Sequence, residues 1–272
     1  MKMRRTEIVV YMLALLFILP QIATAQKKKK HKGELYLSWG YNKEWYTNST
    51  IKINQPDLNN NFKFKSVKGH DHPGWDEGLF SKPISIPQYN YRLGYFFNNK
   101  KDLGVEINFD HTKFIFADNQ NVHVKGTLDG KTYDGHVLFK VNDAVGADSS
   151  SYYFLNNGAN FLLFNIMKRW HWYTNKKENI KIDAIAKAGI GPVIPHVQNK
   201  FFDQPENKPG FQLGGWNTGV EGALRSTFYK HVYLEFAGKL DYARYSGLKI
   251  YKGKAKQAFG TTELILSLGF TL

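Results

Sequence analysis

Apolar and polar residues alternate along most of the chain, and the stretch "YLEFAGKLDYARY" (233–245) shows the pattern plainly. Every second residue from Leu234 to Tyr242 is apolar, aromatic or glycine, and the charged residues Glu235, Lys239 and Asp241 fall between them. A β-strand sends successive side chains to opposite faces, so this stretch predicts a strand with one apolar and one charged face. No segment past residue 25 has an apolar run long enough for a transmembrane helix.

Segments of about ten residues alternate in this way throughout the chain, which is the signature of a transmembrane β-barrel. The predicted strands are 33–46, 88–97, 102–113, 160–170, 180–191, 215–225, 233–245 and 259–272. Short and long links alternate between them, as periplasmic turns and external loops do in outer-membrane barrels. The long links are 47–87, 114–159, 192–214 and 246–258. The sequence therefore predicts an all-β, antiparallel, up-and-down barrel domain of about eight strands over 33–272. An antiparallel sandwich of a soluble domain is the alternative, since its strands alternate equally well.

The N-terminus predicts export. A basic start, the apolar run "IVVYMLALLFILP" and the small residues "ATA" form a signal peptide over 1–25, cleaved near Ala25 and followed by a basic periplasmic segment over 26–32. The chain has no cysteine, so the fold needs no disulfides. Its net charge of +14 in an exported protein favours an anionic membrane surface or lipopolysaccharide as partner, and not nucleic acid. We expect the outer membrane of a Gram-negative bacterium as its location.

The inward faces of the predicted strands carry nearly balanced charge. An eight-stranded barrel is only wide enough for side chains to fill it, so these charges predict a plugged polar lumen that sets register and blocks conduction. The inward acids are Glu34, Glu44, Glu106, Asp110, Asp183, Glu221, Glu235 and Asp241, and the inward bases are Arg92, Arg169, Lys181, Lys187, Arg225 and Lys239. A second interpretation makes Glu106, Asp110 and Asp241 site residues, because they fall towards the external ends of their strands.

Two external segments carry candidate chemistry. In "KGHDHPGWDEG" (68–78), His70 and His72, with Asp76 and Glu77, could ligate a divalent metal; the alternative is a polar turn. In "ARYSGLKIYKGKAK" (243–256), basic side chains alternate with tyrosines, which suits phosphate and sugar groups of lipopolysaccharide; the alternative is a solvated basic loop. The lipopolysaccharide-binding candidates are Arg244, Lys249, Lys252, Lys254 and Tyr251.

With its strands placed, the mature chain resembles small outer-membrane β-barrels of the OmpA/OmpW general type. More narrowly, "YRLGYFF", "LGVEINFDHTKFIF", "NNGANFLLFN", "AGIGPVIPHV" and the run 215–245 resemble a lipid A oxidase-like group. That resemblance implies an enzyme that oxidises the proximal glucosamine of lipid A with a divalent metal and oxygen. It carries over no catalytic residue, so His70, His72, Asp110 and His111 are candidates by position only.

Three functions stay open at this point. The favoured hypothesis is a non-enzymatic barrel that stabilises the outer membrane, or binds lipopolysaccharide or a protein partner through its loops. The second is a lipid A-modifying enzyme at the barrel mouth. The third is a soluble periplasmic binding domain. Shared barrel architecture does not by itself imply shared chemistry.

Overall fold

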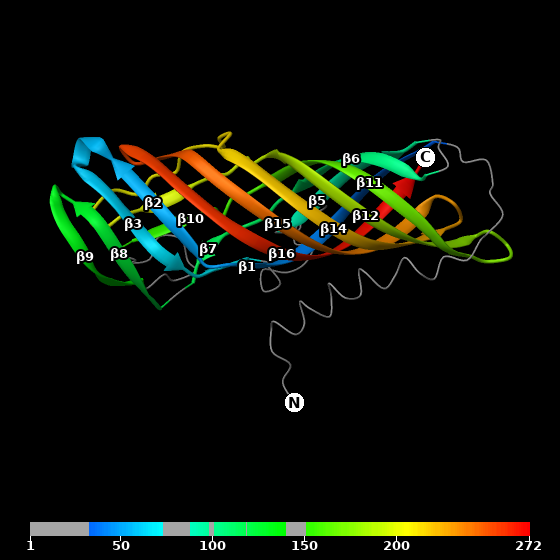
Figure 1. The fold of residues 1–272 in the computed structure, drawn as a ribbon, viewed down its shortest axis with the longest axis horizontal. Helices are drawn as coiled ribbons and strands as arrows, with labels where there is room; N and C mark the ends of the chain where they lie inside the picture. Colours follow the sequence, from blue (N-terminus) through cyan, green and yellow to red (C-terminus); the bar gives the residue numbers. More distant parts are fainter. Residues whose placement is uncertain (1–32, 73–87, 98–100, 118, 140–150) are drawn as a thin grey trace, which may run out of the picture.

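The computed structural model describes residues 33–72, 88–97, 101–117, 119–139 and 151–272, and it shows a closed antiparallel barrel (Figure 1). Its ring strands are β1 (Glu34–Tyr46), β5 (Tyr89–Phe96), β6 (Leu103–Asp110), β11 (Phe161–Thr174), β12 (Ile180–Pro192), β14 (Gly215–Phe228), β15 (Val232–Ile250) and β16 (Gly253–Thr271). Neighbours pair in that order, and pairing between β1 and β16 closes the ring. The predicted eight-stranded barrel is confirmed.

The ring has a large stagger. Starting from Tyr36 on β1 and going from each residue to its direct partner on the next strand, the pairing includes Glu106 on β6 and Asp241 on β15. It reaches β1 again at Tyr46, ten residues after Tyr36. With eight strands, this stagger corresponds to a strand tilt of about 40° and a backbone radius of about 8 Å. Side chains fill an interior of that size, so the register explains why the lumen is packed, and the inward polar residues make it polar.

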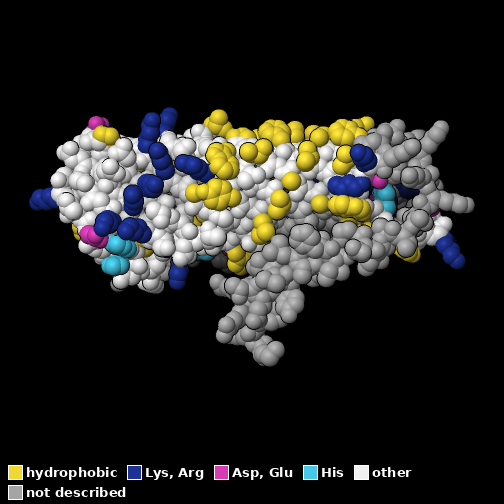
Figure 2. All heavy atoms as spheres, in the orientation of Figure 1, with side chains coloured by type: hydrophobic (Ala, Val, Ile, Leu, Met, Phe, Trp, Pro, Cys, Tyr) yellow, Lys and Arg dark blue, Asp and Glu magenta, His cyan; other side chains and the backbone are white. Residues whose placement is uncertain are grey.

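Burial follows the predicted alternation on every ring strand. Ile166 and Phe236 are 70% and 55% exposed, whereas the inward Arg92 and Glu106 are each 2% exposed. The exposed apolar residues form a belt around the ring (Figure 2). The belt includes Leu35, Leu37, Leu93, Val105, Ile107, Phe164, Ile166, Ile190, Val220, Leu224, Leu234, Phe236, Leu240, Leu266 and Leu268. In a hydrocarbon environment such a belt needs no covering partner, because lipid solvates it.

Beyond the belt, at the end opposite the C-terminus, the barrel continues into an extension built from the predicted long links (Figure 1). The ladder continues from β16 through four further strands, which are β2 (Ser49–Gln55), β3 (Asn60–Val67), β8 (Gln120–Leu128) and β9 (Lys131–Phe139). Short pairs also form there between β4 (Gly69–His70) and β7 (Ile115–Phe116), and between β10 (Tyr152–Phe154) and β13 (Gln198–Lys200). A single 3-10 turn, η2 (Pro56–Leu58), joins β2 to β3.

The extension has its own apolar core. Ile51 and Phe62 from β2 and β3 are fully buried with Phe116, Tyr153 and Phe201 from the other links. Buried aromatic rings meet edge to face, tilted or stacked in this core, and such contacts add to the energy of burial. The described parts of the long links are therefore folded, and their apolar core lies beyond the polar lumen at this end of the barrel.

Segment 246–258 differs most from its predicted form. β15 and β16 run on as a hairpin through it, and only Tyr251 and Lys252 lie outside the two strands. A register shift between Tyr245 and Leu248 interrupts the pairing. The fourth predicted strand also runs further than expected, to Thr174, with a bulge between His171 and Tyr173.

The predicted signal peptide (1–25) and basic segment (26–32) lie outside the described residues, as do Asp76 and Glu77. No helix in the described part of the chain is long and apolar enough to cross a membrane.

Candidate functional site

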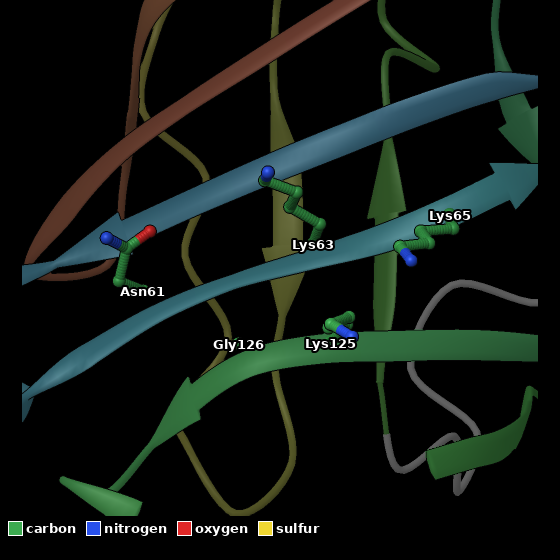
Figure 3. Close-up of a pocket in the computed structure, with 5 residues that line it drawn as sticks. All are labelled: Asn61, Lys63, Lys65, Lys125 and Gly126. Carbon is green, nitrogen blue, oxygen red and sulfur yellow. The ribbon is translucent and has the colours of Figure 1, made fainter. Parts of the chain in front are cut away.

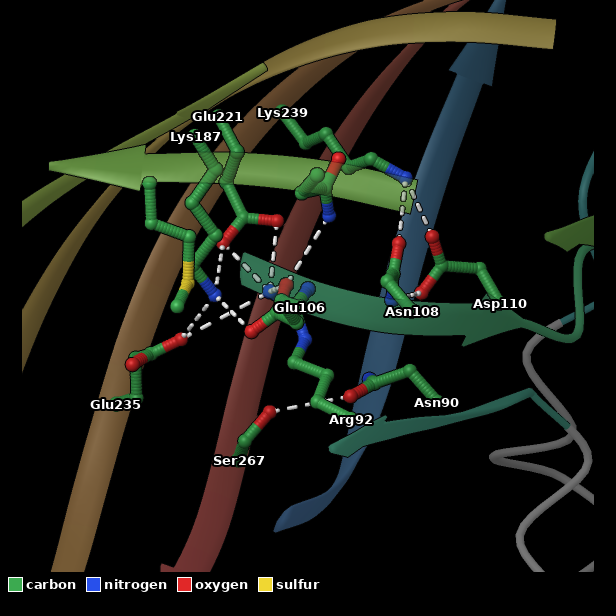
Figure 4. A network of polar contacts seen from close by, with 12 residues as sticks. Asn90, Arg92, Glu106, Asn108, Asp110, Lys187, Glu221, Glu235, Lys239 and Ser267 are labelled. Atoms are coloured by element: carbon green, nitrogen blue, oxygen red, sulfur yellow. Dashed lines mark hydrogen bonds and ion pairs between the residues drawn. The ribbon is translucent and has the colours of Figure 1, made fainter. Parts of the chain in front are cut away.

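The lumen contains a cluster in which bases and acids balance, and we call it the balanced cluster (Figure 4). Its members are Arg92, Lys187, Arg225, Glu106, Glu221 and Glu235. Every one of these side chains is buried, and each comes from a different point on the ring wall. The three cations and three carboxylates thus face each other across the barrel axis, as a buried ionic network requires.

Direct ion pairs connect the members of the balanced cluster. Arg92 donates to both oxygens of Glu221, at 2.6 and 2.8 Å. The Lys187 ammonium lies 2.8 Å from Glu106, 3.0 Å from Glu235 and 3.1 Å from Glu221. Lys187 therefore links carboxylates from β6, β14 and β15, and fixes those strands relative to one another.

Arg225 is held by aromatic rings as well as by a carboxylate. Its Nε donates to Glu235 at 2.7 Å, and its guanidinium carbon lies 4.0 Å from the ring centroids of both Tyr36 and Tyr233. The Tyr36 hydroxyl in turn donates to Glu106 at 2.5 Å. A desolvated guanidinium between two rings gains cation–π attraction that an ammonium would use less well.

Nearer the extension lies a second cluster, in which carboxylates outnumber bases, and we call it the acidic cluster. Lys239 pairs with Asp110 and lies 3.2 Å from Asp241 and 3.8 Å from Glu263. Glu44 stands directly opposite Glu263 in the register of β1 and β16. Among the described residues, Lys239 is the only cation paired with these acids. One ammonium thus serves several buried carboxylates.

The acidic cluster includes a residue that sequence reasoning missed. In the predicted strand 259–272, Glu263 alternates with the apolar Leu264 and Leu266 and so falls on the inward face, although the inward acids predicted from the sequence do not include it; the structure buries it completely. The alternation alone was enough to place it in the lumen. Lys181 and Asp183 lie towards the other end of the barrel, where Asp183 pairs with His171 at 2.5 Å and with Lys181 at 3.4 Å.

The candidate histidines lie in different surroundings. His70 sits on β4 with its Nδ1 2.6 Å from the carbonyl oxygen of Asp71, and His72 is half-buried two residues on. His111 stacks on the Tyr89 ring at 4.6 Å and bonds Asn160 through Nδ1 at 2.8 Å. Burial lowers the pKa of His111 to about 4, although the Asn160 bond opposes the shift.

No group of three or more potential metal ligands forms among the described residues. Asp71, between the two candidate histidines, accepts from Lys43 at 2.6 Å and from the backbone N–H of Glu44 at 2.9 Å. Asp110 lies inside the lumen in its pair with Lys239. The four candidate catalytic residues are thus divided between the lumen, the barrel rim and the extension.

The predicted lipopolysaccharide-binding residues lie together on the outer surface of the β15–β16 hairpin. Arg244 stands directly opposite the exposed Trp216, whose ring lies 5.8 Å from that of Tyr242 at the edge of the belt. Lys249 and Lys254 face each other across the hairpin, and Tyr251 and Lys252 form its turn. We call Arg244, Lys249, Tyr251, Lys252 and Lys254 the basic rim.

Comparison with known proteins gives structural likeness only. No protein-family model matches the sequence, and no curated protein matches it at a significant level. Solved structures that resemble the chain include Neisserial surface protein A (8% identity, 88% of this chain and 99% of that one, TM-score 0.34) and the outer membrane protein OprG from Pseudomonas aeruginosa (12%, 88% and 96%, TM-score 0.36). The outer membrane protease OmpT from Escherichia coli is also similar (10%, 91% and 98%, TM-score 0.37). The fold itself rests on the closed strand register.

Proposed function

We propose that the protein is an outer-membrane β-barrel that conducts no solute and binds lipopolysaccharide through the basic rim. The observation that carries the proposal is the junction of the apolar belt with the rim. Trp216 and Tyr242 mark the edge of the belt, and Arg244 follows immediately on the side of the extension. Aromatic residues of membrane barrels gather at the lipid–water interface, so Arg244 would meet lipid headgroups.

The chemistry of the rim suits the phosphates of lipid A. Arg244, Lys249 and Lys254 are exposed, and no ion pair to a carboxylate of the described residues occupies them. Guanidinium and ammonium groups form charge-assisted hydrogen bonds to phosphate. The position at the belt edge favours a ligand that is itself anchored in the membrane.

The lumen supports a role without conduction. Side chains of the balanced and acidic clusters cross the barrel interior, and the apolar core of the extension lies beyond them. The proposal therefore assigns function to the outer surface. Nothing in the described residues favours a lipid A-modifying reaction, so the test includes modification only as a control.

A binding assay tests the proposal. The mature protein, folded in phosphatidylcholine nanodiscs, is titrated with lipid A, and binding is followed by the rise in its unfolding temperature. The variant Arg244→Gln/Lys254→Gln should bind about tenfold more weakly or worse, since each charge-assisted hydrogen bond to phosphate contributes on the order of 1 kcal/mol.

The matched control is Lys176→Gln/Lys177→Gln, which removes the same charge from an exposed turn at the other end of the barrel. Equal binding by the rim variant and wild type would contradict the proposal. Mass spectrometry of lipid A from cells with and without the protein separates binding from modification: unchanged masses fit the proposal, and a discrete shift that needs the protein would replace it.

A further inference from the structure

The outer face of the extension carries lysines in direct cross-strand register. Lys256 on β16 pairs with Lys52 on β2, Lys52 pairs with Lys63 on β3, and Lys63 pairs with Lys125 on β8. We call these four residues the lysine row. All four are exposed. Because paired residues on one face have Cβ atoms about 5 Å apart, the row is an almost continuous line of positive charge about 14 Å long.

Such a row is unfavourable for the sheet on its own. Like charges directly opposite each other destabilise a β-sheet, and pairing with carboxylates would normally relieve them. Within the described residues, no carboxylate lies within ion-pair distance of Lys52, Lys63 or Lys256. Only Lys125, at the end of the row, has an acid: Asp134 at 2.7 Å. The register therefore gathers charge that this part of the chain leaves uncompensated.

The neighbouring row on the same face carries two amides beside one further lysine. Lys254 pairs with Asn54, and Asn54 with Asn61. These amides present donors and acceptors beside the ammonium groups. A pocket of about 420 Å³ lies between β3 and β8, lined by Asn61, Lys63, Lys65, Lys125 and Gly126 (Figure 3). Cations with adjacent amides suit a ligand that carries both phosphates and hydroxyls.

Gly126 allows the two strands that flank this pocket to approach closely. Its φ of +147° is in the region that favours glycine, and a Cβ there would lie 2.2 Å from the carbonyl oxygen of Asn61. Any other residue would push β8 away from β3 and separate Lys63 from Lys125.

The row also has a direction. Because the ring is staggered, a row of directly paired residues moves towards the extension as it is followed from β1 through the ring to β16. The pairing then continues from β16 into β2, β3 and β8, and the row keeps moving in that direction. The row therefore begins beyond Arg244 at Lys256 and climbs away from the apolar belt towards Lys125. Figure 2 shows Lys and Arg side chains gathered between the belt and the end of the extension.

We propose that the lysine row binds the phosphorylated saccharide core of a lipopolysaccharide molecule whose lipid A lies at the basic rim. This inference rests on the proposed function and extends it, since the row continues the rim into the layer where saccharide replaces lipid. The outward positions of β2 and β3 (Thr50, Lys52, Asn54, Asn61, Lys63 and Lys65) contain no aromatic ring. The part of the face formed by β2 and β3 therefore lacks the aromatic stacking platform on which single-stranded nucleic acid is held.

The test compares two variants and three probes in the nanodisc assay. The row variant is Lys52→Gln/Lys63→Gln/Lys256→Gln, and its matched control, Lys176→Gln/Lys177→Gln/Lys230→Gln, removes the same charge from the turns at the other end. The probes are lipopolysaccharide with a phosphorylated core, the same material after dephosphorylation of the core, and lipid A alone. The row variant should bind the first probe 10- to 100-fold more weakly than wild type and the other two within twofold of wild type.

A second readout separates binding from structure. Without ligand and at low salt, the row variant should unfold at the same temperature as wild type or higher, because it has lost like-charge repulsion. An unchanged affinity for the first probe, or an equal loss for all three, overturns the inference. The inference is also overturned if a 20-nucleotide single-stranded DNA binds wild type as tightly as the first probe does and no longer binds the row variant. The rim variant tests the proposed function separately. If that variant binds lipid A as tightly as wild type, the proposed function is wrong, whereas binding of the saccharide core by the lysine row is still judged from the row variant.

Discussion

Removing the Lys239 ammonium should destabilise the barrel far more than removing a surface lysine. In Lys239→Met the buried side chain stays unbranched and becomes one atom shorter, and it loses its charge. Asp110, Asp241 and Glu263 then lose the cation that, among the described residues, lies within 4 Å of all three. Breaking a buried ion pair from one side typically costs about 3–5 kcal/mol, because the remaining charge is left uncompensated.

Urea titration of the barrel in detergent micelles, followed by tryptophan fluorescence, would measure this cost. With an m-value of about 3 kcal/mol/M, the expected loss moves the midpoint down by roughly 1–1.7 M. The exposed Lys177→Met serves as the control and should change the free energy of unfolding by less than about 1 kcal/mol.

A double variant decides whether the cost comes from uncompensated charge. Lys239→Met/Asp110→Asn removes the ammonium together with the carboxylate it pairs with. It should be more stable than Lys239→Met alone, because one buried charge fewer is left without a partner. If the two substitutions instead add their costs, or if Lys239→Met costs less than about 1 kcal/mol, Lys239 does not neutralise the acidic cluster.

Two further predictions concern the lumen and the rim of the barrel. In planar bilayers the purified protein should show no large stable conductance, since Lys187 and Lys239 with their carboxylates fill the interior; steady porin-like openings would overturn the packed lumen. His111 should titrate near pH 4 in an NMR titration of the folded protein, because burial disfavours its charged form. Its contribution to stability is complete above about pH 6.5 and declines as the pH falls from there to about 4; a midpoint near 6.5 would contradict its burial against Tyr89.

The ring was predictable because its strands must alternate. Any strand with lipid on one side and a polar lumen on the other repeats every two residues, so the face of Glu106 or Lys239 follows from its phase alone. The alternation does not predict which side chains these residues contact across the lumen. Which side chains meet across the lumen depends on the stagger of the ring, and that stagger arises from pairings between residues far apart in the sequence.

The strands of the extension also alternate, but they are not among the eight strands predicted from the sequence. "STIKINQ" and "NNFKFKSV" alternate as clearly as the ring strands, and Ile51 and Phe62 point inward as that pattern requires. Both segments lie within 47–87, the first long link of the predicted barrel, and they are shorter than most of the ring strands. Their alternation predicts strands but not the position of Lys52 beside Lys256, which only the three-dimensional pairing supplies.

The stagger that fixes the lumen also shapes the outer surface. In a ring with this tilt, a row of paired residues moves towards the extension as it is followed from β1 through the ring to β16. In the extension β16 pairs with β2 and no longer with β1, so the row continues there without returning to the ring. A line of side chains that starts near the belt therefore rises into the layer beyond the lipid without leaving the sheet. The interior is occupied by its own charges, and on this outer face Arg244, Lys256, Lys52 and Lys63 have no ion pair with a carboxylate of the described residues. The same backbone register thus packs the inside and exposes a rising line of charge outside, which is why binding of an anionic ligand is expected on the wall of the barrel and not in its lumen.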